Sequence, residues 1–271
     1  MELKYQNLED NTPIRLNKFL SESGICSRRE ADRLIQLGKV RVDGERAECG
    51  MKVFPRQEVR VGQKKVRNKP DMVILAVNKP AGIVCTEERR ERNSIVRFLK
   101  YPTRITYIGR LDKDSEGLLL MTNNGDIINR IMRASNFHEK EYIVKVKEVI
   151  TEEFLQAMRN GVEILGTTTR PCKVEMIGKY TFRIILTQGL NRQIRRMCEA
   201  LENEVKSLRR VRIMNIELGD LKEGEYRELT SVELEELSKG IQHSTNIGAW
   251  EKERGNERQT ETHARTRGEV K

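Results

Sequence analysis

Apolar positions near the start of the chain recur at helical spacing. A first helix is predicted from about residue 14 to Gly24, with three apolar residues on one face: Leu16, Phe19 and Leu20. Ser27 and Glu30 then have the spacing of a capping box, and they predict a second helix that ends at Gly38. Two short helices therefore open the sequence.

The pattern next changes to alternation. Val40 and Val42 alternate with basic residues, and the Asp43-Gly44 pair that follows is typical of a tight turn. A strand or short hairpin is therefore predicted after the two helices. The polar, basic stretch from Gly62 to Asp71 has the composition of a linker, so a small helix-helix-strand domain is expected before it.

A second apolar core follows the linker. The run "MVILAV" is continuous and β-branched, as in a buried strand. Further strands are predicted at residues 104–108, 117–122, 141–146 and 182–187, and helices at "DIINRIMRA", "TEEFLQAMRNG" and "NRQIRRMCEALEN". Strands and helices without a regular β-α-β alternation predict an α+β fold. The expected divisions are a tail over 1–12, a first domain over 13–70, a second over 71–238, and a charged, disordered tail over 239–271.

Charge adds a partner class to this picture. The net charge is +10, and the segment from Asn11 to Pro70 holds most of the excess, with 15 basic and 7 acidic residues. Arg28 and Arg29 lie in the first turn of the predicted second helix, where unpaired backbone N–H groups favour an anion. A nucleic acid is the partner that this asymmetry favours, and a merely solvated basic face is the alternative.

Composition excludes several classes of protein. No apolar run approaches the roughly 20 residues that cross a bilayer, and the polar start "MELKYQNLEDN" lacks a signal-peptide core, so a cytoplasmic location is expected. The five cysteines are scattered, without a CxxC pair or a Cys/His cluster: Cys26, Cys49, Cys85, Cys172 and Cys198. Neither a disulfide nor a metal site is predicted.

The stretch "GRLDKDSEGLLLMTNNGD", residues 109–126, places a carboxylate, Asp112, ahead of a buried strand. Its acids fit the first positions of an EF-hand loop, but position 12 is Asn123, which lacks the bidentate carboxylate, so calcium binding is excluded. An ordinary turn is the simplest alternative. Against it, no other catalytic constellation is evident in the chain, so any enzymatic chemistry must depend on few ionisable groups.

The same stretch closely resembles the signature of the pseudouridine synthases that act on ribosomal RNA, with Asp112 at the position of their essential aspartate. "NKPAGIVCT", "EKEYIVKV" and "GLNRQIRRM" are similar to three further segments of that family, and "RLNKFLSESGICSRREADRLIQLGKVRVDGERA" resembles an S4-type RNA-binding domain. The resemblance runs from about Arg15 to Thr230. It implies an S4-type domain followed by a catalytic domain with a mixed, mainly antiparallel sheet.

The resemblance also implies an activity. Such enzymes break the glycosidic bond of a chosen uridine, rotate the freed uracil and rejoin it through carbon 5, without a cofactor. Asp112 is then a buried nucleophile or base, kept ionised by an ion pair from Arg195. On its predicted helix, Arg195 shares a face with Arg192, opposite an apolar stripe formed by Ile194, Met197 and Cys198. Tyr142 supplies the ring that receives the flipped base. From the residues alone, Tyr142 could instead be an aromatic side chain of the core. Arg192 stands where many relatives have His, and this adds a cation beside the site.

The implied partner is ribosomal RNA, of the large subunit in preference to the small subunit or transfer RNA, bound by a monomer. The residues expected to contact RNA are all basic: Arg15, Lys18, Arg28, Arg29, Lys39, Arg41, Arg110 and Arg192. Arg110 could equally pair with Asp114 or Glu116. The rival function is a non-catalytic RNA-binding platform, which has no need of Asp112, Tyr142 and Arg195 together.

Overall fold

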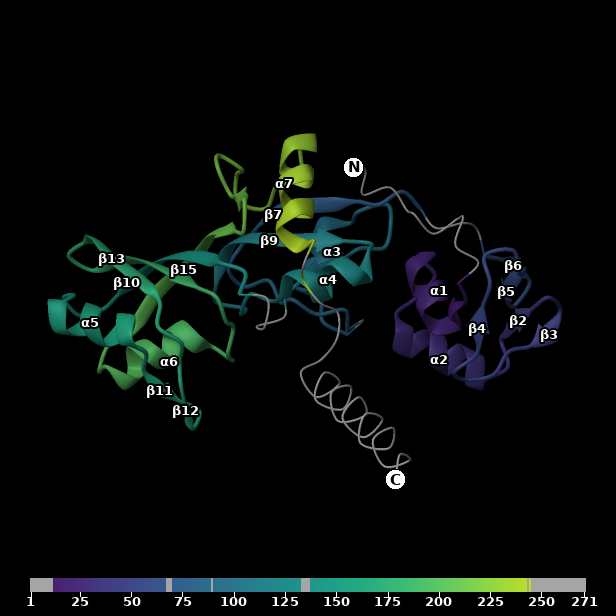
Figure 1. Cartoon of the computed structure of the whole chain (residues 1–271), viewed down its shortest axis with the longest axis horizontal. Coiled ribbons are helices and arrows are strands. Elements are labelled where there is room, and N and C mark those ends of the chain that lie inside the picture. The colour runs from purple at the N-terminus through teal and green to yellow at the C-terminus, as the bar shows by residue number, and fades with distance from the viewer. Residues whose placement is uncertain (1–11, 67–69, 89, 133–136, 243, 245–271) are drawn as a thin grey trace, which may run out of the picture.

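The protein is described by a computed structural model over residues 12–66, 70–88, 90–132, 137–242 and 244. Most of the two tails predicted at 1–12 and 239–271 lies outside these residues. Within the described chain, an N-terminal helical domain precedes a larger domain built on one long sheet, as Figure 1 shows. The fold is α+β, as the sequence predicts.

The N-terminal domain consists of two helices and short strands: β1 (Ile14–Arg15), α1 (Leu16–Glu22), α2 (Arg28–Gln36), β2 (Val40–Val42), β3 (Glu45–Arg46), β4 (Lys52–Val53), β5 (Val59–Val61) and β6 (Lys64–Lys65). The Ser27 side chain accepts the N–H of Glu30 at 3.2 Å, which confirms the predicted cap of α2. Asp43 and Gly44 both have positive φ, as the turn of the β2–β3 hairpin requires. Leu20 and Ile35 join the two helices in one buried core.

One prediction here is wrong. Part of the supposed linker, Lys64–Lys65, is β6, which pairs with β5. The turn at Gly62, with φ +58°, folds the chain back, and Val66 is buried against the domain core. The two lysine side chains are exposed on this strand. Their charge gave the segment the composition of a loop, which explains the wrong prediction.

The larger domain has a nine-stranded sheet in the order β13-β14-β10-β15-β9-β7-β17, with β16 on β15 and β8 on β9. Its strands are β7 (Ile74–Lys79), β8 (Thr106–Ile108), β9 (Glu116–Thr122), β10 (Lys140–Val146), β13 (Lys173–Gly178), β14 (Thr181–Leu186), β15 (Val205–Ile213), β16 (Ile216–Glu217) and β17 (Tyr226–Glu228). All these pairings are antiparallel except that of β15 with β9. The sheet is therefore mixed and mainly antiparallel, as the resemblance implied.

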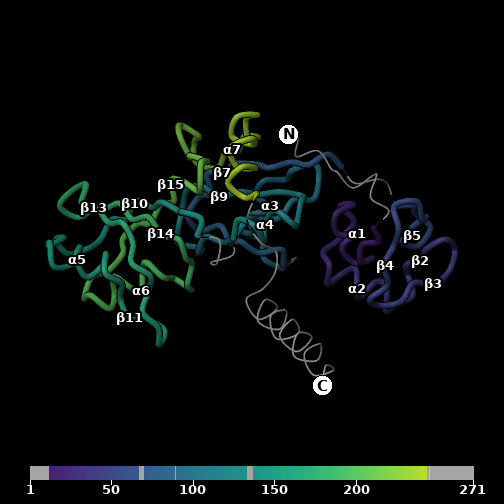
Figure 2. Tube along the Cα trace, viewed as in Figure 1, coloured from purple at the N-terminus to yellow at the C-terminus, as the bar shows by residue number. Residues whose placement is uncertain are grey.

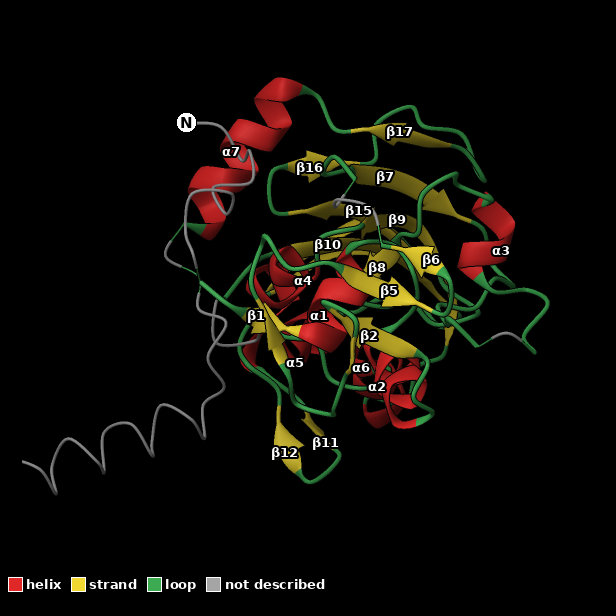
Figure 3. Cartoon of the chain, turned by 90° about the vertical axis from the view of Figure 1, so that its right-hand side faces the viewer, coloured by secondary structure: helices red, strands yellow, loops and turns green. Residues whose placement is uncertain are grey.

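Helices and one small hairpin surround this sheet: α3 (Ile95–Leu99), α4 (Gly125–Met132), α5 (Glu152–Asn160), α6 (Gln193–Ala200), α7 (Ser231–Ile241), and the hairpin of β11 (Glu163–Ile164) with β12 (Thr167–Thr168). The tube in Figure 2 shows α7, from the end of the described chain, beside the start of the sheet at β7. The β11–β12 hairpin extends from the body of the domain (Figure 3).

Two packed regions hold the sheet. Under one half, Val144, Phe182 and Met197 join β10, β14 and α6 in a single core. In the other half, β7 and β9 are buried on both faces, since Leu118 and Leu120 pack towards α4 and α7 while Leu119 packs towards α3. Continuous apolar runs such as "MVILAV" are what a strand covered on both faces requires.

The structure also corrects the predicted end of this domain. Helix α7 continues to Ile241, past the boundary at residue 238, and Leu237 and Ile241 are both buried. The predicted strands and helices are present, but β15, at nine residues one of the longest strands, was not predicted. Four basic residues interrupt its apolar pattern and disguise it: Lys206, Arg209, Arg210 and Arg212.

The two domains touch through polar side chains. Lys18 of α1 donates to both carboxylate oxygens of Asp126 on α4, at 2.8 and 2.9 Å. Arg104 of the larger domain approaches the Ser21 hydroxyl of α1 at 3.4 Å. In Figure 1 the α1 end of the N-terminal domain accordingly faces α3 and α4.

Candidate active site

Asp112 lies on the loop that connects β8 to β9, at the edge of the buried strands. The N–H of Ser115 donates to the Asp112 carbonyl at 3.1 Å, so the loop contains a turn, and Ser115 is only 1% exposed. Gly109 opens the loop with φ +72°, and a side chain there would overlap Met132 of α4. The turn interpretation is thus correct for the backbone, and the packed turn fixes the position of the carboxylate.

The surroundings of Asp112 differ from the prediction in two respects. Its side chain is 37% exposed rather than buried, and its ion pair is with Arg192, whose Nη1 is 3.8 Å from Asp112 Oδ2. Arg195 instead donates from Nη2 to the Asp114 carbonyl at 3.0 Å and to the Ser115 hydroxyl at 3.4 Å. Arg195 therefore braces the loop, while Arg192 faces the carboxylate.

Helix α6 brings both arginines to this place. Ile194, Met197 and Cys198 are buried on one side of it, which confirms the predicted apolar stripe. Arg192 is outside the helix, at the residue before its first turn, with φ +50°. Because the backbone bends there, Arg192 and Arg195 reach the same loop from different directions. The prediction that they share one helix face is wrong.

Tyr142 approaches the same region from β10. It is half-buried, its strand neighbours Val144 and Val146 lie in the core beneath, and its ring contacts two of the apolar clusters. In the register of the sheet Tyr142 lies opposite Arg210, whose guanidinium carbon is 6.0 Å from the centre of the tyrosine ring. Part of the ring is therefore core and part is available to a ligand.

These side chains surround one cavity of about 420 Å³. Its cationic lining comes from separate strands, loops and a helix: Arg110, Lys140, Arg192, Arg195 and Arg210. Asp112 is the one carboxylate among the described residues that line it. No ion pair joins Arg110 to Asp114 or Glu116, all of which the structure describes. The cavity is positively charged around a single acid, which suits an electron-rich ligand.

Among the described residues, no group of three His, Cys, Asp or Glu side chains could hold a metal ion. No disulfide bond joins any two of the five cysteines, all of which lie in the described residues. Burial raises the pKa of Cys198 to about 12 and that of Cys172 to about 11, so these two remain neutral thiols. None of the helices that the structure describes is long and apolar enough to cross a membrane.

Comparison with known proteins shows which family this chain is similar to. Residues 73–200 match the RNA pseudouridylate synthase family and residues 14–54 match the S4 domain. The dual-specificity RNA pseudouridine synthase RluF of Escherichia coli K12 is 52% identical over 238 residues, which cover 87% of this chain and 82% of the relative. The chain belongs to the RNA pseudouridine synthase family.

Two further relatives support the assignment of this pseudouridine synthase. The ribosomal large subunit pseudouridine synthase B of Bacillus subtilis is 36% identical over 241 residues, which cover 86% of this chain and 98% of that protein. A crystal structure of a pseudouridylate synthase, 30% identical, superimposes with a TM-score of 0.62 and covers 83% of this chain and 99% of its own. The synthase is thus an RNA-modifying isomerase with an appended S4 domain.

The residues predicted to contact RNA are not equally free to do so. The following are exposed: Arg15, Arg28, Arg29, Lys39, Arg41 and Arg110. Lys18 is already engaged by Asp126 and lies 3.7 Å from Glu22, so its charge is largely compensated within the protein. Arg28 and Arg29 begin α2, where the Ser27 cap leaves other N–H groups of the first turn unpaired by the helix itself.

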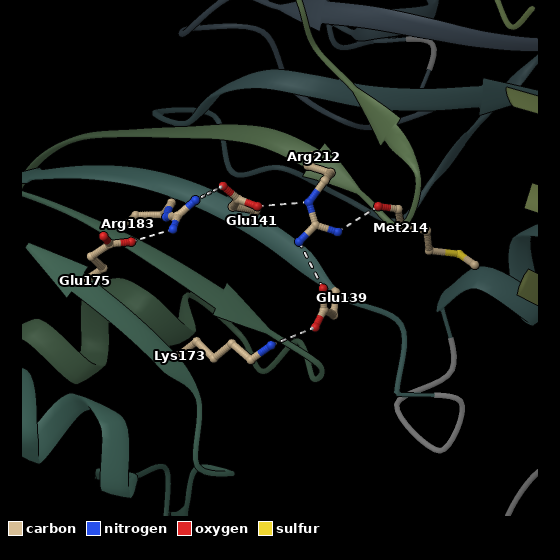
Figure 4. A network of polar contacts seen from close by, with 7 residues as sticks. All are labelled: Glu139, Glu141, Lys173, Glu175, Arg183, Arg212 and Met214. Carbon is tan, nitrogen blue, oxygen red and sulfur yellow. Dashed lines mark hydrogen bonds and ion pairs between the residues drawn. The ribbon is translucent and has the colours of Figure 1, made fainter. Parts of the chain in front are cut away.

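The synthase sheet has a second polar face, behind Tyr142. Figure 4 shows there a network in which acids and bases alternate across β10, β13, β14 and β15. Arg212 bridges Glu139 and Glu141, at 2.9 Å each, and Arg183 bridges Glu141 and Glu175. Because these charges neutralise one another, this face offers RNA far less attraction than the cavity side.

Sequence reasoning missed three buried cations of the synthase. Lys79 and Arg210 are 0% and 1% exposed, and Lys140 is 5% exposed. Lys79 pins the turn after β7 by donating to the carbonyls of Pro80 and Ile83 at 2.7 and 2.8 Å. Lys140 could have been found, since it precedes Tyr142 by two residues on an alternating strand and therefore shares its face.

Proposed function

We propose that this chain converts a specific uridine of large-subunit ribosomal RNA to pseudouridine, with Asp112 as the reacting carboxylate. The observation that carries the proposal is the single acid, Asp112, within a cationic cavity that also contains Tyr142. A relative named for the large ribosomal subunit and one described as dual-specificity support the substrate class. Ribosomal RNA as substrate implies that the enzyme acts in the cytoplasm.

The proposed reaction requires few protein groups beyond these residues. The bond between ribose C1′ and uracil N1 breaks, the uracil turns, and C5 bonds to C1′, with loss of the C5 proton and gain of a proton at N1. Asp112 either attacks C1′ or removes the C2′ proton to give a glycal, and its partly exposed carboxylate suits both routes. Arg192 places a positive charge 3.8 Å from the reacting carboxylate.

Access to the uridine requires that the base leave its helix. A carboxylate cannot reach C1′ of a stacked nucleotide, so the base is flipped out and received on an aromatic ring. Tyr142 supplies this ring, since it is held by the core on one side and lines the cavity on the other. Arg110, at the mouth of the Asp112 loop, contacts the opened RNA backbone.

The S4 domain supplies sequence-independent affinity. Its exposed arginines at the start of α2 meet phosphates, with Arg15, Lys39 and Arg41 as further contacts. The enzyme is proposed to act as a monomer.

The test is release of tritium from carbon 5 of uridine in large-subunit ribosomal RNA. We expect release by the wild type and none by Asp112→Asn at equal RNA occupancy. Asp114→Asn is the matched control, since its carboxylate is exposed on the same loop but does not line the cavity, and it should retain activity. Tight binding without release from large-subunit, small-subunit or transfer RNA would contradict the proposal and favour the platform function.

A further inference from the structure

Arg210 is the largest of the fully buried side chains in the described part of the chain, and it is only partly paired. It is 1% exposed, and its Nε donates to the carbonyl of Leu118 at 2.7 Å. Its Nη2 is buried and has no hydrogen-bond partner among the residues that the structure describes. A buried charged donor without an acceptor destabilises the fold, so a protein retains one only where something compensates that cost.

The position of Arg210 indicates where this acceptor comes from. Its guanidinium lines the active-site cavity beside the Tyr142 ring, at 6.0 Å. Lys140 lines the same cavity from the strand position two before Tyr142, so a second buried cation lies on the same face. None of the acids in the described part of the chain pairs with Arg210. The missing partner is therefore an electron-rich group of the ligand.

The reaction creates such a group. When the C1′–N1 bond breaks, its electron pair leaves with the uracil, which becomes an anion with charge shared among N1, O2 and O4. The ribose carbon is balanced by a bond to Asp112 or by loss of its C2′ proton. C5 then bonds to C1′ with an electron pair of the ring, and this step displaces Asp112 or, in the glycal route, is accompanied by return of a proton to C2′. The ring is then neutral, and loss of the C5 proton with gain of a proton at N1 completes the product. Negative charge on the base therefore exists only between cleavage of the C1′–N1 bond and formation of the C5–C1′ bond.

We propose that Arg210 is a catalytic residue whose Nη2 donates to a carbonyl oxygen of the uracil and stabilises the anion formed when the glycosidic bond breaks. This rests on the proposed function of the cavity. The base is the partner rather than a phosphate, because Arg210 lies beside the ring on which the base stacks. A fixed donor in a site sheltered from water acts more strongly on developing charge than on the neutral substrate, and this difference is what accelerates a reaction.

The test compares two substrates that differ in how well the base carries charge. Fluorine at carbon 5 withdraws electrons and makes the departing uracil a more stable anion. Ribosomal RNA transcribed with uridine or with 5-fluorouridine is incubated with saturating enzyme, and the C5-linked nucleoside is quantified by chromatography and mass spectrometry after digestion. Arg210→Met should lower the single-turnover rate on uridine RNA by about 100-fold. The loss on fluorinated RNA should be clearly smaller.

Arg209→Met is the matched control, because Arg209 is the neighbouring residue of β15, is exposed and does not line this cavity. It should leave both rates unchanged. If Arg210→Met does not fold, Arg210→Lys retains a cation and should show the same unequal losses on a smaller scale.

Equal losses on the two substrates, in whichever variant folds, would show a structural role and overturn the proposal. Absence of product from either RNA with wild-type enzyme is a different result, and it would refute the proposed function itself.

Discussion

At the scale of single residues, Lys140 makes the stability of the molecule depend on pH. Burial and, to a lesser extent, the nearby charge of Arg210 together lower its pKa to about 8. Because the unfolded chain holds this proton up to the ordinary lysine pKa of 10.5, the unfolded state binds more protons than the folded one between those two pH values. The free energy of unfolding therefore increases as the pH rises through this window. Below the window, the buried lysine is charged and its full destabilising effect is present.

Lys140→Met should remove this dependence. The variant should be at its most favourable relative to wild type at pH 7, and its advantage should shrink by up to about 3 kcal/mol as pH rises from 8 towards 10.5. Urea unfolding at several pH values measures the difference. Lys145→Met, on the same strand and exposed, is the control and should follow wild type. A constant gap between Lys140→Met and wild type would mean that Lys140 keeps its ordinary pKa.

Arg195 should affect rate more than affinity. It braces the Asp112 loop through the Asp114 carbonyl, so Arg195→Met leaves the carboxylate less well placed without removing an RNA contact. We expect a single-turnover rate about 100-fold lower with RNA affinity nearly unchanged. Ser115→Ala deletes only the longer 3.4 Å contact and should cost much less. Equal losses of rate and affinity for Arg195→Met would identify it as a binding residue.

The sequence predicted which residues meet at the site more reliably than how they pair. Asp112, Tyr142 and Arg195 do line one cavity, because motif residues mark the ends of strands and a helix that converge. The partner of Asp112 was not predictable, since it depends on the left-handed backbone at Arg192, a conformation that no spacing reveals. Arg210 was missed because a buried arginine in a strand is indistinguishable, by pattern, from a solvated one.

At the scale of elements, the junction of β9 with β15 depends on Gly117. Its φ is +98°, and a side chain there would collide with the backbone oxygen of Arg210 and lie 2.9 Å from its nitrogen. This is where the one parallel pairing of the sheet occurs, and it sets the strand that holds Arg210 against the strand that follows Asp112. The backbone conformation and the close approach of β15 therefore explain why a glycine occupies this position of the family signature.

Gly117→Ala should therefore destabilise the protein by about 2–4 kcal/mol, through strain at positive φ and through the clash with backbone. Gly125→Ala is the matched control: its site in α4 has open space and no positive φ, so alanine should be neutral or stabilise by up to about 1 kcal/mol. Urea unfolding measures both variants. If Gly117→Ala proved as stable as wild type, the close approach of β9 and β15 would be refuted.

Element prediction succeeded where one force dominated. Helix α6 and strand β7 were found because their apolar residues recur at a regular period. Strand β15 and helix α7 were missed because tertiary packing, not local pattern, decides them: Arg210 is buried by its place under Tyr142, and Ile241 by the core beneath α7. Non-local burial of this kind is not encoded in a short window of sequence.

At the scale of the whole molecule, charge is divided between surfaces. The S4 domain exposes unpaired arginines, the cavity gathers five cations around one acid, and the network behind Tyr142 is self-neutralised. RNA is thus attracted to one side of the sheet and to the appended domain. The sequence predicted the basic domain from its charge excess, but the neutrality of the rear face depends on strand register and emerged only with the structure.

The S4 domain should contribute affinity that salt weakens, because each phosphate contact releases counterions. Replacing Arg28 and Arg29 together by Ala should raise the RNA concentration at half-saturation. It should also lower the slope of log affinity against log salt by up to about 1.8, while the rate on saturating RNA stays nearly constant. Binding titrations from low to moderate salt, with single-turnover rates at saturation, measure both quantities.

Arg33→Ala provides the matched control for this prediction. Arg33 lies on the same helix, but its guanidinium donates to the Glu30 carboxylate at 2.8 and 2.9 Å. Because that carboxylate neutralises its charge, Arg33 attracts a phosphate only weakly. Its removal should leave the salt slope close to that of wild type. A double Arg28 and Arg29 variant with an unchanged slope would remove the start of α2 from the RNA interface. The cavity of the larger domain would then account for the salt-dependent affinity alone.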